Sequence, residues 1–470
     1  MTLDAQGGLT EPCEPRIDAP VPARISLASA TRVWARIGLL GFGGPAGQIA
    51  LMHRELVDKH RFISEPRFLH ALSYCMLLPG PEAQQLAVYI GWMMHGRRGG
   101  LVAGTLFVLP GFVIVLALAA VYALFAHVPW VAAVFFGLKA AVMAIVVDAV
   151  IRIGRRAVRG VFLAGVSAVA FVAIYALRVP FPFIVLGAAA LGAVVERLQP
   201  TLFPAAPVAE AELRGAYLID ALLQRGELEH TRPDLRRAVA TLVVGLLAWA
   251  GPLALVAAWL GPGHVVAVEG AFFGKAAVVT FSGAYAVLAY VAQRAVETYG
   301  WLTPGEMVDG LGLAETTPGP LIMVVEFVGF LGAFRAPAPL GSLAAGVLGA
   351  VVTTWATFAP CFLWIFLGGP YVEALRRSRV LRAALTTVTA SVVGVIINLS
   401  LWFALHTAFD VQRIERLGAL SISVPVLASV QWPALVLAVA ASIALLGFRL
   451  GVERTLAMSA AAGLVWSWLR

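Results

Sequence analysis

The chain has 470 residues, of which 60% are hydrophobic and 13% are charged, and its mean hydropathy is +0.88. Soluble proteins carry about 25% charged residues, so this composition indicates an integral membrane protein. At about 20 apolar residues per membrane-spanning helix, about a dozen spans use up the chain. A large soluble catalytic domain is thereby excluded, and with it most enzyme classes.

The net charge of +8 is interpreted as a sign of membrane topology and not of a charged binding partner. In so hydrophobic a chain, lysine and arginine belong in loops, where they set the orientation in the membrane, and nucleic-acid binding is not indicated. The cysteines Cys13, Cys75 and Cys361 stand far apart, with no CxxC pair or histidine cluster beside them. We therefore expect no disulfide framework, no metal site and no cofactor.

Apolar runs and their breakers predict an all-α polytopic membrane protein with about thirteen transmembrane helices. Residues 1–29, polar and rich in proline, are expected to be a disordered cytoplasmic tail, because their charge is the reverse of that of a signal peptide. The polar segment 198–236 predicts a cytoplasmic linker, and 237–263 a connecting transmembrane helix. The predicted spans lie near 30–53, 67–95, 100–126, 129–151, 160–177, 180–196, 238–259, 264–292, 303–334, 339–367, 380–406, 430–448 and 452–469.

Lysine and arginine counts support a cytoplasmic N-terminus. With the N-terminus inside, 23 of the 34 basic residues fall on the inner side, nine on the outer side and two within spans. One predicted outer loop, 53–67, is an exception to this bias, because it holds four basic residues, Arg54, Lys59, Arg61 and Arg67. The sequence leaves open whether 67–95 crosses as one broken helix or dips in as a re-entrant hairpin, and a hairpin would change this topology.

The chain also contains an internal repeat. A shift of 239 aligns Phe42-Gly43-Gly44 with Phe281-Ser282-Gly283 and Pro79-Gly80-Pro81 with Pro318-Gly319-Pro320, and a shift of 250 aligns Pro110 with Pro360. We expect two homologous halves, 30–197 and 264–470, in inverted orientation because an odd number of spans separates their starts. Inverted repeats with broken helices are typical of secondary transporters, which bind substrate near the bilayer midplane between the repeats.

These motifs resemble a known family. Phe42-Gly43-Gly44-Pro45, Leu78-Pro79-Gly80-Pro81 followed by Gln85 to Gly91, and Leu109-Pro110-Gly111 are similar to the blocks of the bacterial chromate ion transporters, in their long, two-domain form. The resemblance covers about residues 30–200 and 264–400. It implies a multi-pass protein of the bacterial cytoplasmic membrane that exports chromate and confers chromate resistance. In the second half Ser282 and Ala284 replace the glycine and proline of the first block, so the two halves differ at this motif.

Two cations and two helix breaks are the predicted substrate site. Arg36 and Lys275 align at the shift of 239, and one cation from each half would compensate a divalent oxyanion. Each Pro-Gly-Pro triplet starts a new helix, whose free N–H groups and positive dipole end favour an anion. The full set of predicted binding residues is Arg36, Gly43, Gly44, Pro79, Gly80, Pro81, Gln84, Gln85, Lys275, Ser282, Gly283, Thr316, Thr317, Pro318, Gly319 and Pro320.

Three carboxylates, Glu82, Asp148 and Glu326, are candidates for coupling transport to protons. Each feature also has a plainer interpretation. Arg36 would end a span and reach the interface, Asp148 would pair with the basic cluster at 152–159, and the triplets would be packing kinks. Glutamine and threonine beside the breaks would serve helix–helix hydrogen bonding.

The favoured function is a proton-coupled chromate exporter, with sulfate or another oxyanion as the alternative substrate because no residue separates these dianions. A channel is a further alternative, since it would need no coupling carboxylate. An enzyme is not expected, because the eight histidines form no metal-binding or nucleophile–base spacing within a span. A homodimer is left open.

Overall fold

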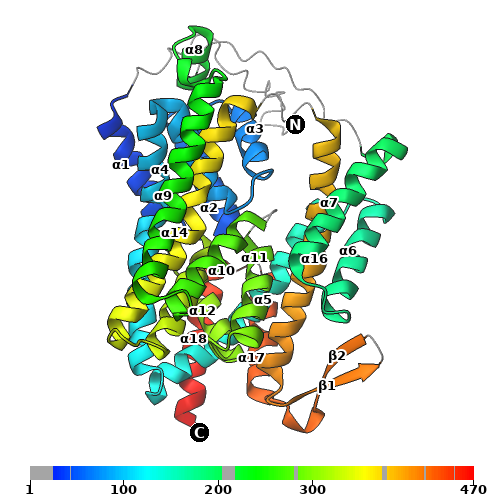
Figure 1. The fold of residues 1–470 in the computed structure, drawn as a ribbon. Coiled ribbons are helices and arrows are strands. Elements are labelled where there is room, and N and C mark those ends of the chain that lie inside the picture. Colours follow the sequence, from blue (N-terminus) through cyan, green and yellow to red (C-terminus); the bar gives the residue numbers. More distant parts are fainter. Residues whose placement is uncertain are drawn as a thin grey trace, which may run out of the picture.

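The computed structural model describes residues 25–42, 44–203, 217–279, 284–372, 378–417, 420–448 and 450–469. The described chain is predominantly helical (Figure 1). The first-half helices are α1 (Leu27–Leu40), α2 (Gly44–His53), α3 (Glu65–Cys75), α4 (Glu82–Phe125), α5 (Pro129–Ala157), α6 (Val161–Tyr175) and α7 (Phe181–Leu198).

Among the described residues between the halves there are two α-helices, α8 (Leu218–Gln224) and α9 (Leu235–Leu260). The second half consists of α10 (Val265–Val279), α11 (Ala284–Gln293), α12 (Pro304–Thr316), α13 (Val324–Arg335), α14 (Ser342–Gly368), α16 (Arg379–Ala408), α17 (Trp432–Ser442) and α18 (Val452–Leu469). Short π-helical turns follow α2, α11 and α17, at Arg54–Lys59, Arg294–Thr298 and Ile443–Gly447. Short 3₁₀ turns lie at Pro200–Leu202, Glu229–Thr231, Leu321–Met323, Gly369–Tyr371 and Leu427–Ser429.

Six described helices are long and apolar enough to cross a membrane. They are Glu82–Phe125, Pro129–Arg155, Phe181–Leu198, Leu235–Leu260, Ser342–Tyr371 and Arg379–Ala408, and the apolar helices Val161–Tyr175 and Trp432–Gly447 are shorter. The chain is thus an all-α membrane protein, as predicted, whereas the expected number of thirteen spans is not confirmed. One small departure is an antiparallel hairpin of β1 (Gln412–Leu417) and β2 (Leu420–Pro425), which the sequence analysis did not anticipate.

Two of the predicted spans are helical hairpins. Tyr74 on α3 and Tyr89 on α4 bring their ring centroids within 5.5 Å, although 15 residues separate them, so the chain reverses at Pro79-Gly80-Pro81. In the second half, a Cβ on Gly310 of α12 would lie 2.4 Å from the ring of Phe327 on α13. The segment 67–95 is therefore a hairpin, which decides the alternative that the sequence left open.

A second reversal follows within α4. His95 and Gly96 leave the helical conformation, and Gly96 has φ +61°, a left-handed value that favours glycine. The two arms, 82–94 and 97–125, pack so closely that a Cβ on Gly99 would lie 2.2 Å from the carbonyl oxygen of Gly91. Small residues permit this approach between helix backbones. The second arm lies beside α1, since a Cβ on Gly38 would lie 2.0 Å from the carbonyl oxygen of Leu106.

The repeat is visible in the hydrogen bonds. Phe62 N–H donates to Leu56 at 2.7 Å, and Trp301 N–H donates to Ala295 at 2.8 Å, a shift of 239 for donor and acceptor alike. Arg61 and Gly300, which also align, both have positive φ, 51° and 63°. The two segments therefore share one local fold, in which a π-helical turn leads through a left-handed residue into α3 or α12.

The interhalf linker docks on the first half. Leu218 and Ile219 of α8 donate backbone hydrogen bonds to Arg61 and Phe62 at 3.1 and 2.9 Å. Both leucine and isoleucine are buried in the hydrophobic cluster of α1 to α4. Figure 1 shows α8 at the same end of the molecule as the start of α9. The linker and the loop before α3 therefore lie on one side of the protein, and the sequence analysis was wrong to place loop 53–67 on the opposite side.

Candidate functional site

Each Pro-Gly-Pro break packs against the long helix of the opposite half. A Cβ on Gly111 of α4 would lie 2.5 Å from the carbonyl oxygen of Pro318. On the other side, a Cβ on Gly80 would lie 2.8 Å from Sγ of Cys361 on α14. Gly111 and Cys361 align at the shift of 250, and Gly80 and Gly319 at 239, so the two contacts are the same contact formed twice. The breaks are thereby held at the interface between the halves.

Both triplets need glycine at their centre. Gly80 has φ +113° and Gly319 has φ +103°, values that side chains rarely adopt. The flanking prolines remove backbone donors and fix φ, so the helix ends before the triplet and a new one starts after it. Pro81 and Pro320 occupy the N-cap positions of the following helical segments, and neither supplies a capping side chain.

A buried glutamine ties the first half to the second break. Gln48 of α2 is fully buried, and its Nε2 donates to the carbonyl oxygens of Gly41, at 3.3 Å, and of Gly319. Gly319 N–H also donates to Gly41 at 3.1 Å. Nearby, the Glu315 carboxylate lies 3.9 Å from a Cβ built on Gly44. The break after α1 and the break after α12 therefore form one polar contact, which sequence reasoning missed although Gln48 is a polar residue in an apolar run.

Unsatisfied polar atoms gather at the start of α4. Both side-chain atoms of the Gln84 amide group, Oε1 of Gln85 and Oε2 of Glu82 are buried without a hydrogen-bond partner among the described residues. Gln85 Nε2 donates to Pro79 at 2.7 Å. Buried polar groups are normally paired, so these atoms mark a place where a ligand, a proton or water supplies the missing partner. The amide of Gln84 is the side-chain donor that remains available to an anion.

The predicted threonines donate elsewhere. The hydroxyl group of Thr316 donates to Leu313 at 2.9 Å, and that of Thr317 donates to Ala314 at 3.3 Å. Their hydrogens are thus used within α12, and each oxygen presents lone pairs rather than a donor. In this conformation the two hydroxyl groups therefore cannot donate to an oxyanion.

The two predicted cations differ in their surroundings. Nε of Arg36 lies 3.6 Å from the buried carboxylate of Glu55, and the Arg36 side chain is 56% exposed. Burial works against ionisation of Glu55, but the hydrogen bond and charge of Lys59, with Arg36 and His60, outweigh it and hold its pKa below the ordinary value. Lys275, one turn before the end of α10, is exposed and has no ion pair with a described residue. Arg36 and Lys275 do not meet through any contact among the described residues.

The remaining predicted residues fall into three groups. Asp148 pairs with Arg152 at 3.5 Å, one turn along α5. This agrees with the alternative interpretation, in which Asp148 pairs with the basic cluster at 152–159. Glu326 on α13 is fully buried, and neither carboxylate oxygen has a partner among the described residues. Gly43, Ser282 and Gly283 lie outside the residues that the structure describes.

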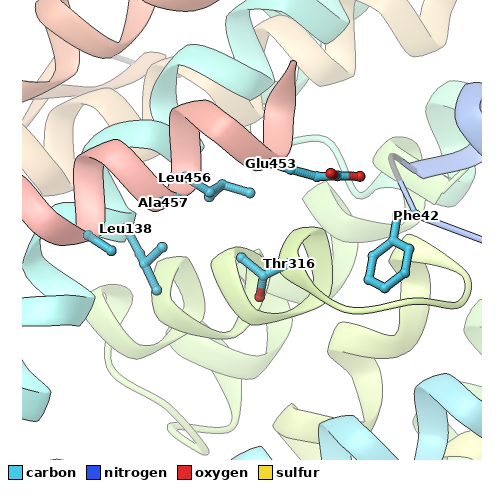
Figure 2. A pocket seen from close by; sticks show the side chains of 7 residues that line it. Phe42, Leu138, Thr316, Glu453, Leu456 and Ala457 are labelled. Atoms are coloured by element: carbon cyan, nitrogen blue, oxygen red, sulfur yellow. The ribbon is translucent and has the colours of Figure 1, made fainter. Parts of the chain in front are cut away.

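A cavity of about 360 Å³ adjoins the second break. It lies between α18, α5 and the end of α12, and Figure 2 shows Leu456 and Ala457 above Thr316, with Phe42 at one side. Its lining is mainly apolar, and its polar members are Thr316 and Glu453. Water occupies about 30 Å³ per molecule, so a five-atom oxyanion would fit. The cavity offers room but little that would hold a dianion in this conformation.

Comparison with known proteins decides the family. Residues 28–193 and 270–466 match the chromate transporter family. The chain belongs to this family. It is similar to the chromate transport protein of Pseudomonas aeruginosa, with 33% identity over 411 residues that cover 87% of each chain.

Two other relatives give the same result. A chromate transport protein of Cupriavidus metallidurans is 30% identical, over 80% of this chain and 82% of its own. A probable chromate transport protein of Synechococcus elongatus is 29% identical, over 79% and 83%. No solved structure matches. The family predicted from the motifs is confirmed, and the chain is a multi-pass membrane protein of a transporter family.

Proposed function

We propose that the chain is a secondary transporter that exports chromate from the cytoplasm and so confers chromate resistance. The observation that carries this proposal is the reciprocal packing of each Pro-Gly-Pro break against the opposite half, because it joins two helix breaks at one interface. Transporters bind substrate at such places, where half-helix N-termini meet anionic groups. The relatives named chromate transport protein supply the substrate.

The orientation that we propose is inverted, with a cytoplasmic N-terminus. Loops that touch must lie on one side of the membrane. Arg178, which lies on the outer side, pairs with Glu297 at 3.1 Å, so we assign the nearby Arg294 to the outer side as well. Asp220 of the cytoplasmic linker binds loop 60–64, so we assign the four basic residues of loop 53–67 to the inner side. The count then becomes 26 basic residues inside and six outside, a stronger bias than before.

In the proposed binding mode, the dianion lies at the breaks between the halves. The free N–H groups at the start of α4 and the Gln84 amide donate to its oxygens, and Lys275 supplies positive charge. The tight contacts at Gly111 and Gly80 close the site in the observed conformation, so binding requires the halves to move apart. Because Arg36 pairs with Glu55, Lys275 is the more available of the two aligned cations.

Proton coupling would use Glu82 and Glu326. Both carry buried carboxylate oxygens without a described partner, and burying an ionised carboxylate is costly unless it is paired. Protonation would relieve this cost in one conformation, and release of the proton would follow exposure in another. Asp148 is less suited because Arg152 already pairs with it.

Everted membrane vesicles test the function directly, because export then becomes uptake. We expect energised vesicles to accumulate chromate, a protonophore to abolish the accumulation, and Lys275→Ala to reduce it at least about tenfold, the usual effect of losing a hydrogen bond to a charged group. Equilibration without accumulation would indicate a channel. Sulfate accumulation without chromate would make sulfate the substrate, and movement of neither ion would contradict the proposal.

A further inference from the structure

An ion pair that sequence analysis did not identify joins the two halves at α12, nine residues before the second break. Nζ of Lys139 on α5 lies 3.3 Å from Oδ2 of Asp309 on α12. The hydroxyl group of Tyr122 on α4 donates to the same oxygen at 2.8 Å. Lysine and tyrosine come from the first half and the aspartate from the second. Intramembrane ion pairs are rare and mark substrate or ion pathways.

The two charged partners are held very differently. The Asp309 side chain is 4% exposed, whereas that of Lys139 is 28% exposed. Tyr122 fixes the carboxylate and is itself fixed by the rings of Phe135 and Phe327, at centroid distances of 4.8 and 5.1 Å. Lysine has a flexible stem with a compact charge at its end. The aspartate is therefore a fixed partner, and the lysine is the one that can exchange partners.

The pair shares the helices α5 and α12 with the cavity of Figure 2, although neither Lys139 nor Asp309 is among the residues that line it. Leu138, the residue before Lys139, lines that cavity, as does Thr316 on the helix that carries Asp309. Asp309 precedes Thr316 by two helical turns, about 10 Å along α12. Like a tetrahedral oxyanion, the Asp309 carboxylate offers the Lys139 ammonium group two oxygens that share negative charge.

The pair has no counterpart in the other half. The residues at the equivalent positions are His70 and Thr389, which cannot form an ion pair because threonine is uncharged. The other charged groups around Asp309 are already engaged, since Arg335 pairs with Glu306 on the outer turn of α12. The Lys–Asp combination is therefore present at one of the two equivalent places.

We propose that Lys139 is a substrate-binding cation, and that Asp309 holds it in place until an oxyanion displaces the carboxylate. This inference rests on the proposed function and adds a residue to its site. Exchange of one oxygen anion for another keeps the ammonium group paired throughout, so the empty site carries no uncompensated charge. Tyr122 keeps Asp309 ready to take Lys139 back once the substrate leaves.

Transport kinetics in everted vesicles test this inference. We expect Lys139→Met to raise the KM for chromate at least about tenfold, since hydrogen bonds to charged groups are worth that much in affinity. Asp309→Asn should lower the KM several-fold while slowing turnover, because it removes the competitor for Lys139. The double variant Lys139→Met, Asp309→Asn leaves no unpaired charge and should restore the amount of folded protein while keeping the raised KM.

A matched control is another ion pair between the halves. Arg178→Met combined with Glu297→Gln also removes an interhalf pair, at 3.1 Å, and should leave the KM within twofold. A double Lys139, Asp309 variant with a wild-type KM would overturn the inference and reduce the pair to a structural contact. Equal KM values for the two single variants would overturn it as well.

Binding to purified protein separates this inference from the proposed function. Chromate should raise the unfolding temperature of the wild type and not that of Lys139→Met. If the wild type is stabilised but transports neither chromate nor sulfate, the proposed function fails and the inference stands. If Lys139→Met is stabilised as much as the wild type, the inference fails whatever the protein transports.

Discussion

The Gly111→Ala variant should lose more than nine-tenths of chromate transport. The added Cβ would lie 2.5 Å from the Pro318 carbonyl oxygen and 3.1 Å from Cα of Gly319, distances that backbone atoms can relieve only by moving. Overpacking of this kind costs about 1–3 kcal/mol and shifts the helix. Because the contact closes the site between the halves, the shift would leave it open or misshapen.

Gly319→Ala should be at least as severe. Its φ of +103° is unfavourable for any side chain, and its Cβ would lie 3.0 Å from Cα of Gly111. Gly187→Ala on α7 is the matched control, since nothing lies within 4 Å of its Cβ. Uptake by everted vesicles, normalised to folded protein from size-exclusion chromatography, measures the effect. Activity of Gly111→Ala within twofold of Gly187→Ala would show that the close approach of break and helix is not needed.

The second large effect concerns the linker. In the second half, Thr303 and Glu306 form a capping box, with Thr303 N–H donating to the Glu306 carboxylate at 2.8 Å, and Arg335 pairs with that carboxylate. In the first half the residue equivalent to Glu306 is Arg67, and the carboxylate comes from Asp220 of α8. The linker thus completes the start of α3, which the first half cannot do alone.

Asp220→Ala should lower the free energy of unfolding by about 3 kcal/mol, as expected when a buried, multiply bonded carboxylate is lost. Asp220 accepts from Ser64 N–H, Ser64 Oγ and Arg67 Nε at 3.1, 3.2 and 2.8 Å. Thermal unfolding of detergent-purified protein measures the loss. Asp234→Ala, which removes an exposed cap of α9, should cost only about 1 kcal/mol.

A rescue variant distinguishes capping from mere packing. Adding Arg67→Glu to Asp220→Ala creates the sequence Ser64-Glu65-Pro66-Glu, a capping box like that of Thr303 and Glu306. We expect this double variant to recover about half of the lost stability. A double variant less stable than Asp220→Ala would show that the linker stabilises α3 in some other way.

The family and the repeat were predictable from sequence because both rest on spacing. Glycine and proline at fixed positions mark breaks, and two sets of breaks at one shift mark a duplication. The reversal at each break was not predictable. A proline-broken helix and a hairpin have the same apolar pattern, and only contacts such as Tyr74 with Tyr89 separate them. The sequence signal of the hairpin was the excess of basic residues in loop 53–67, which the predicted topology placed on the outer side.

The site was predictable only in part. The triplets stand out by composition, whereas Gln48, Asp309 and Cys361 matter through residues more than 150 positions away. Lys139 is one of the two basic residues that fall within predicted spans, but the carboxylate on its own helix, Asp148, is nine residues away and pairs with Arg152. Partners from opposite halves follow from the way the halves pack, which no local pattern records.

The most direct test of the account is counterflow in liposomes that contain only the purified protein. Liposomes loaded with unlabelled chromate should take up labelled chromate transiently above equilibrium, and the Gly111→Ala variant should not. Such counterflow requires a binding site that is exposed to one side at a time. Labelled chromate that only equilibrates would contradict a transporter with its site between the halves, and no uptake of chromate would contradict the substrate.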